Sequence, residues 1–258
     1  MSDVTTAPVH LTPDDYHVIG PQDFNAPGLS ARESIGPYVS IRALGPLLTI
    51  HDSRFEADTG IGHHPHQGME RLFYILEGTV DHDDALNNIT GHMGTGDLGI
   101  LTEGRRGMIH SEWNNSDGPA RAYIFVYPTD PTPATASFDA VRDADAPRTQ
   151  PADGVTAKTV IARDSGRLRG DVREIVDATL DGGSTLTFDL GPDEAGLVFV
   201  VGGDVQVTVD GTSVRALRTD HTVLLPPDAR ARTVEVVAGA DSRIIQAVTG
   251  QGYGFRRG

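Results

Sequence analysis

The sequence contains no cysteine, a single tryptophan, and no long hydrophobic run among its 258 residues. The lack of cysteine excludes disulfides, thiolate metal sites, iron–sulfur clusters and thiol nucleophiles, and it fits a reducing compartment. No apolar run approaches the roughly 20 residues of a membrane span. The first residues show neither the basic nor the apolar region of a signal peptide. We therefore expect a soluble, cytoplasmic protein that has no membrane contact.

Basic residues are scarce, because 21 Lys and Arg stand against 36 Asp and Glu for a formal net charge of −15. Binding to a phosphate backbone needs clustered cations, so we do not expect a direct nucleic-acid partner. Long helical patterns are also missing. The 30 glycines and 16 prolines punctuate short apolar runs of strand length, which favours an all-β fold.

The composition divides the chain into four parts. We predict an N-terminal arm over 1–34, a β domain over 35–130, a Pro- and Asp-rich linker over 131–153, and a second β domain over 154–258. The two domains resemble each other, since LFYILEGTVDH (72–82) and LVFVVGGDVQV (197–207) match in residue class at an offset of 125. This repeat predicts tandem copies of one β module. Any helix is expected near the linker or the C-terminus.

Two pairs of metal-binding residue types occur at i, i+2 spacing. His64 and His66 form one pair, and His110 and Glu112 form the other. Alternate residues of a strand project from one face, so both pairs can point into one pocket if their strands are neighbours. The 44 residues from His66 to His110 give room for three or four strands, as a jelly-roll barrel requires. Three imidazoles and a carboxylate suit iron, manganese, nickel, copper or zinc, and do not suit calcium.

The blocks around these pairs resemble a known family. HPHQGMERLFYILEG (64–78) and GDLGILTEGRRGMIHSEW (96–113) are similar to the two signature blocks of pirins, within the cupin superfamily. The resemblance implies two tandem double-stranded β-helix barrels, a bicupin, with Fe(II) in the first barrel and no metal in the second. It also implies that His64, His66, His110 and Glu112 are the ligands. Gln67 and Met69 depart from the usual arginine and phenylalanine of the first block.

The alternation that begins at His64 and His66 also predicts where Glu70 and the apolar residues after it point. That parity predicts that Glu70, Leu72 and Tyr74 point inward, with Leu72 and Tyr74 forming the pocket wall. Glu70 is then either a second carboxylate for acid–base chemistry or a residue that orients a ligand histidine. His51 could also line the pocket.

Three further histidines in the first domain are not expected to bind the metal. His63 has the opposite parity to His64, and we expect His82 and His92 to be solvated hairpin residues. In the second domain, the offset of the repeat places Asp189, Gly191 and Thr233 at the ligand positions, so we expect no metal there.

The resemblance implies an oxygen-dependent opening of a flavonol, the quercetin 2,3-dioxygenase reaction, with a small molecule and O2 as substrates. Glu112 or Glu70 would accept the proton of the substrate. One alternative is a non-catalytic, iron-binding redox sensor that regulates a protein partner. Another is a metal-dependent biosynthetic enzyme that acts on a different small molecule.

Overall fold

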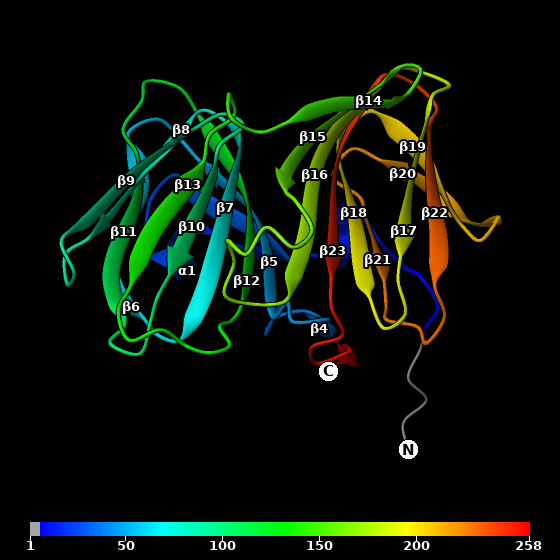
Figure 1. The fold of residues 1–258 in the computed structure, drawn as a ribbon. Helices are drawn as coiled ribbons and strands as arrows, with labels where there is room; N and C mark the ends of the chain where they lie inside the picture. The colour runs from blue at the N-terminus through cyan, green and yellow to red at the C-terminus, as the bar shows by residue number, and fades with distance from the viewer. Residues whose placement is uncertain (1–5) are drawn as a thin grey trace.

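Short runs of β-branched and aromatic residues, separated by turns, form strands along nearly all of the chain in the computed structural model, which describes residues 6–258. The strands build two β-barrels that stand side by side (Figure 1). The first barrel has a sheet of seven strands and a sheet of four. In spatial order the larger sheet contains β13 (Ser137–Val141), β10 (Leu98–Thr102), β7 (Met69–Glu77), β12 (Ala120–Pro128), β5 (Thr49–Phe55), β3 (Leu29–Ile35) and β2 (His17–Ile19). The smaller sheet contains β6 (Thr59–His66), β11 (Met108–Asn114), β8 (Thr79–Asp84) and β9 (Ile89–Gly94).

The second barrel repeats this plan. Its larger sheet has the order β1 (Val9–Leu11), β21 (Thr222–Leu225), β18 (Ala195–Gly202), β23 (Ser242–Thr249), β16 (Val172–Leu180), β15 (Val155–Ile161) and β14 (Arg148–Ala152). Its smaller sheet has the order β17 (Thr185–Leu190), β22 (Arg232–Ala238), β19 (Asp204–Val209) and β20 (Thr212–Arg218). The matching strand orders confirm the predicted all-β bicupin. A separate pair joins β4 (Ile41–Leu44) to β24 (Phe255–Arg257), so the end of the chain returns to the first half.

The segments predicted as an arm and a linker differ from expectation in the structure. The arm contributes β2 and β3 to the first barrel and β1 to the second, while its residues 1–5 lie outside the described part. The linker segment contributes β13 to the first barrel and β14 to the second. The polar composition of β1, β2, β13 and β14 fits their places at the edges of the sheets, whereas β3 lies between β2 and β5 and is largely buried. The two helical turns, η1 (Pro13–Asp15) and α1 (Pro21–Phe24), lie near the N-terminus and not at the positions predicted.

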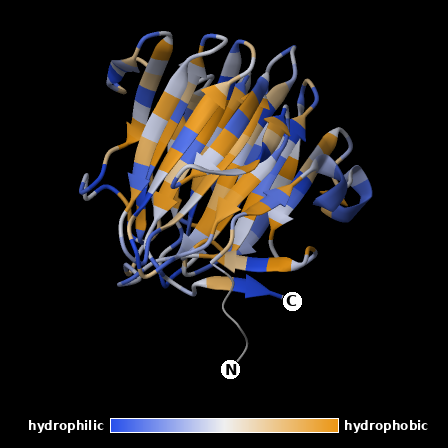
Figure 2. Cartoon of the chain, turned by 90° about the vertical axis from the view of Figure 1, so that its right-hand side faces the viewer, coloured by the Kyte–Doolittle hydropathy of each residue, from blue (hydrophilic) through white to orange (hydrophobic). Residues whose placement is uncertain are grey.

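The larger sheets of the two barrels face each other across the centre of the molecule (Figure 1). One hydrophobic cluster joins side chains of both barrels, including Tyr74 and Phe125 from the first and Leu197 and Ile245 from the second. Two further clusters fill the barrel interiors. Hydrophobic and hydrophilic bands alternate along many strands, as expected where the two faces of a sheet have different surroundings (Figure 2).

No helix within residues 6–258 is long and apolar enough to cross a membrane.

Candidate metal centre

The two predicted pairs lie on neighbouring strands of the smaller sheet of the first barrel. His64 of β6 stands directly opposite His110 of β11, and His66 stands opposite Met108. Pro65 is accommodated because β6 is an edge strand. A register shift between His110 and Glu112 interrupts the ladder at the site. Such irregularities redirect side chains, and they are frequent next to functional sites.

The four side chains converge. The ring centroids of His64, His66 and His110 are 4.7–5.0 Å apart. Glu112 Oε2 lies 3.9 Å from His64 Nε2, and Glu112 Oε1 lies 3.1 Å from His110 Nδ1. Potential ligand atoms of His64, His66 and His110 lie within 4.8 Å of one another. The predicted residues therefore form a candidate metal-binding cluster.

The hydrogen bonds at two of the histidines leave nitrogen atoms free for a cation. His110 is fully buried, and its Nε2 atom has no hydrogen-bond partner among the described residues. An unpaired buried polar atom is costly unless a ligand, ion or water satisfies it. His64 Nδ1 donates to the carbonyl of Gly62 at 2.9 Å, which leaves the lone pair on Nε2. Fixing the tautomer through the second nitrogen is the usual arrangement of a metal-binding histidine.

Burial sets the charge state of the cluster. It lowers the pKa of His110 far below the ordinary value, with contributions from the neighbouring histidines. Burial and the adjacent Arg71 lower the pKa of His66 to about 3, and burial lowers the pKa of His64. Burial raises the pKa of Glu112 to about 7, although Arg71 acts in the opposite direction. Near neutral pH the imidazoles are thus uncharged, which is the form that binds a metal.

A cavity of about 240 Å³ opens on the cluster. Six of its lining residues are apolar: Phe24, Leu29, Phe55, Ile61, Phe73 and Ile124. The polar lining includes His64, His66 and Glu112, together with His51 and Arg71. Cavities that are largely apolar and carry a few convergent polar groups are typical of small-molecule sites.

Glu70, Leu72 and Tyr74 do not line this cavity, which corrects the expectation from strand parity. The carboxylate of Glu70 accepts hydrogen bonds from Thr102 (2.8 Å), Tyr127 (2.7 Å) and the backbone N–H of Arg169 (2.8 Å). Leu72 and Tyr74 belong to the cluster between the barrels. Their neighbours Arg71 and Phe73 line the cavity instead. The reason is that β6 ends at His66 and a new strand begins at Met69, so the parity of one strand does not carry over to the next.

His82 is the residue that the sequence reasoning missed. It is 2% exposed instead of solvated, and its Nδ1 atom lies 3.3 Å from His110 Nδ1. With His110 and Glu112 it forms a second group of potential ligands. The signal was the alternation in TVDHDD, because Val80, His82 and Asp84 share one face of β8 and are all buried.

His63 and His92 lie away from the cavity. His63 is bonded to Asp83 at 2.9 Å, and His92 is bonded to Asp81 at 2.5 Å; both histidine side chains are well exposed. His63 follows the predicted parity, and His92 is solvated as expected.

The second barrel carries apolar side chains at the topologically equivalent positions. Strand β22 pairs with β17 and β19 as β11 pairs with β6 and β8. In this register Val234 is equivalent to His110 and Val236 is equivalent to Glu112. Phe188 takes the position of His64. The equivalence differs by one residue from the predicted Thr233 and Asp189, which are exposed and bonded to each other.

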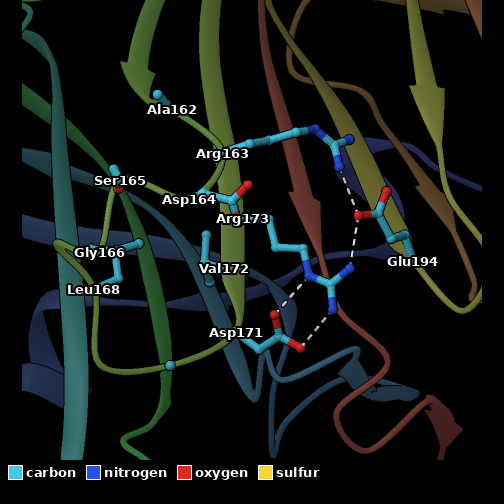
Figure 3. A pocket seen from close by; sticks show the side chains of 11 residues that line it. Ala162, Arg163, Asp164, Ser165, Gly166, Leu168, Asp171, Val172, Arg173 and Glu194 are labelled. Carbon is cyan, nitrogen blue, oxygen red and sulfur yellow. Dashed lines mark hydrogen bonds and ion pairs between the residues drawn. The ribbon is translucent and has the colours of Figure 1, made fainter.

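A separate polar cavity of about 530 Å³ lies beside the loop from 162 to 171 and the start of β16 (Figure 3). Arg163 and Arg173 both contact Glu194, at 2.7 and 2.8 Å, and Arg173 also contacts Asp171. The two guanidinium groups are thus paired with acids of the same barrel, which favours a structural role for this ion network.

The first half matches known proteins at the level of sequence. The family model described as Pirin matches residues 22–125. Quercetin 2,3-dioxygenase of Escherichia coli strain K12 is 44% identical over 70 residues, which is 27% of this chain and 29% of that protein. Human pirin is 26% identical over 210 residues, which is 77% of this chain and 69% of that protein. The matches to quercetin 2,3-dioxygenase relatives thus span about a third of the length of those proteins.

Solved structures extend the likeness to both barrels. The crystal structure of YhhW from Escherichia coli superposes with a TM-score of 0.75 at 21% identity, covering 95% of this chain and 98% of that one. A structure of the same bacterial pirin in complex with nickel(II) gives a TM-score of 0.73 at 20% identity, covering 95% and 99%. The first half of the chain is thus similar in sequence to the Pirin family, and the whole chain shares the fold of these solved pirin structures.

Proposed function

We propose that this protein is a metal-dependent dioxygenase that acts on a small enolisable or phenolic substrate, in a reaction of the quercetin 2,3-dioxygenase type. In this proposal His64, His66, His110 and Glu112 hold an Fe(II)-type metal. The observation that carries the proposal is the convergence of the three histidines beside an apolar cavity that Glu112 also lines, with the buried Nε2 atom of His110 left unpaired. Such a donor set without sulfur is suited to a redox-active or Lewis-acidic transition metal.

The protein residues would bind and orient the substrate. The apolar wall, to which Phe55 and Phe73 belong, would pack against an aromatic ring and exclude water from it. The volume of about 240 Å³ lies below the range of roughly 300–1,000 Å³ for drug-sized ligands, which favours a substrate of one or two rings, or a flavonol bound by its reactive ring. Quercetin 2,3-dioxygenase names among the relatives support oxygen chemistry on such a ring system.

Arg71 adds a positive charge to the cavity. Its Nε donates to Glu103 at 2.7 Å, and its Nη2 donates to His66 Nδ1 at 2.7 Å. A divalent metal together with Glu112 and the Arg71–Glu103 pair would give the site a net charge of about +1, which favours an anionic substrate.

The test combines metal analysis with oxygen uptake. We expect about one equivalent of metal in the wild type. His110→Ala should lose most of this metal, because a buried ligand is removed. His63→Ala is the matched control, since His63 is an exposed histidine on the same strand as His64. Stoichiometric metal in His110→Ala would contradict the ligand assignment.

Oxygen consumption with quercetin, and with smaller 3-hydroxy-4-pyrones, then tests catalysis. We expect uptake that depends on the metal and is lost in His110→Ala. Bound metal without oxygen uptake for any of these compounds would contradict the dioxygenase proposal and would favour a regulator that binds a protein partner.

A further inference from the structure

We propose that His51, held in place by the buried carboxylate of Glu33, is the general base that removes the acidic proton of the substrate. This inference rests on the proposed function for the class of substrate, an enol or phenol. Glu70 faces away from the cavity and Glu112 is a candidate ligand, so a base other than the two carboxylates expected from the sequence is needed.

His51 and Glu33 form a directly opposed cross-strand pair on β5 and β3. His51 Nε2 lies 3.1 Å from Glu33 Oε2. A carboxylate only accepts hydrogen bonds, so the imidazole carries its proton on Nε2 and keeps the lone pair on Nδ1. His51 Nδ1 has no hydrogen-bond partner among the described residues, while the His51 side chain lines the cavity and is 20% exposed. His51 is thus an imidazole at the cavity wall that a third group orients, which is an arrangement used in general base catalysis.

The surroundings of Glu33 are built to hold its carboxylate. Glu33 is 1% exposed, and its Oε1 atom accepts the backbone N–H of Tyr38 at 2.7 Å. A Cβ atom at Gly36 would collide with the carboxyl group of Glu33, so only glycine leaves room for the carboxylate at that point of the turn. Burying a carboxylate costs free energy unless it is hydrogen-bonded, and here both oxygens have partners. Glu33 is thus a positioning residue for His51.

The proton transfer is balanced without a further reactant. The O–H bond of the enol or phenol breaks, its electron pair remains on oxygen, and the proton forms an N–H bond at His51 Nδ1. The imidazolium is stabilised by the negative charge of Glu33, and the substrate becomes the anion that the positively charged site attracts.

The experiment measures proton transfer without turnover. The probe is maltol, a single-ring 3-hydroxy-4-pyrone, which is added to the Ni(II)-loaded protein without oxygen in weakly buffered solution near neutral pH. The absorbance of the pyrone reports its anion, and a pH indicator reports protons that reach the solvent. In the wild type we expect the anion to form with little proton release, because His51 keeps the proton. In His51→Gln we expect release of about one proton for each maltol bound.

His92→Gln is the matched control, since His92 is also paired with a carboxylate but lies on the exterior, and it should behave as the wild type does. Equal proton release by the wild type and His51→Gln would overturn the inference, as would a wild type that does not bind maltol.

Turnover gives a second and separate readout. We expect kcat of His51→Gln to fall by about 10²- to 10⁴-fold with little change in KM, and added imidazole to restore part of the activity of His51→Ala. Glu33→Gln should lower kcat in the same direction, and Glu33→Asp should recover part of that loss. Unchanged kcat in both His51 variants would refute the inference. Proton capture by the wild type without oxygen uptake from any substrate would refute the dioxygenase and leave His51 as the base.

Discussion

The buried acid Glu112 should make the stability of the metal-free protein depend on pH. Burial raises its pKa from an ordinary 4.5 to about 7, and only 4% of the residue is exposed. Because one pKa unit corresponds to about 1.4 kcal/mol, these two values correspond to roughly 3 kcal/mol of stability.

The sign follows from which state binds the proton more tightly. Below pH 4.5 both the folded and the unfolded state carry the proton, so Glu112 does not make the free energy of unfolding depend on pH there. Between pH 4.5 and about 7 the unfolded state loses its proton first. The free energy of unfolding therefore falls as the pH rises through this window, and the loss is complete above it.

The assay compares the wild type with Glu112→Gln, both treated with chelator and unfolded in urea at about pH 5 and pH 8. Burial lowers the pKa values of His66 and His82, to about 3 and about 4, and these histidines contribute the opposite slope to both proteins. The difference between the two proteins thus isolates Glu112. We expect the variant to gain about 2–3 kcal/mol relative to the wild type between the two pH values. A difference that does not change with pH would refute this reasoning.

At pH 8 a bound metal should favour the stability of the wild type over that of Glu112→Gln. A bound cation takes the deprotonated carboxylate, so Ni(II) should raise the stability of the wild type at pH 8 more than that of Glu112→Gln. Equal stabilisation of both proteins by Ni(II) would show that Glu112 is not a ligand.

Three other variants separate the roles of residues near the cluster. Glu70→Gln should lower stability by about 1–3 kcal/mol in urea unfolding, because an amide replaces a buried acceptor of three hydrogen bonds, and it should leave metal content unchanged. His82→Phe should weaken metal binding about 10- to 100-fold in competition with a chelator, because His110 loses the nitrogen that faces its Nδ1; unchanged affinity would contradict this. Replacing Arg71 and Glu103 together by Met and Gln should tighten metal binding about three- to tenfold in the same competition, because the guanidinium that donates to His66 Nδ1 and competes for the lone pair of that ring is removed; weaker binding would contradict that reasoning.

Much of the site could be predicted from the sequence because its signals are local. Residues two apart on a strand share a face whatever the rest of the fold does, so the pairing of His64 with His66 and of His110 with Glu112 needed only the strands themselves. The repeat between the halves was also visible, because each copy keeps the same apolar strand, glycine turn and second strand.

The surroundings of Glu70 and His82 depend on strand boundaries and strand pairing that the local sequence does not specify. The parity of β6 stops at the turn after His66, and only the start of β7 at Met69 decides that Glu70 faces the second barrel. His82 is buried because β8 pairs with β11 on the side opposite β6, which brings it to His110 from a distant part of the chain.

The sequence by itself thus determined the class of fold, the resemblance to pirins and the two local pairs of candidate ligands, because periodicity and short motifs are properties of contiguous residues. Only the tertiary structure decided which residues surround those pairs. Long-range strand pairing brought His51 and Glu33 together on neighbouring strands and placed His51 in the cavity wall, and it placed valines of the second barrel at the positions equivalent to His110 and Glu112. The physical reason is that register between distant strands is set by the packing of whole sheets, where a slip of one residue exchanges the inner and outer faces.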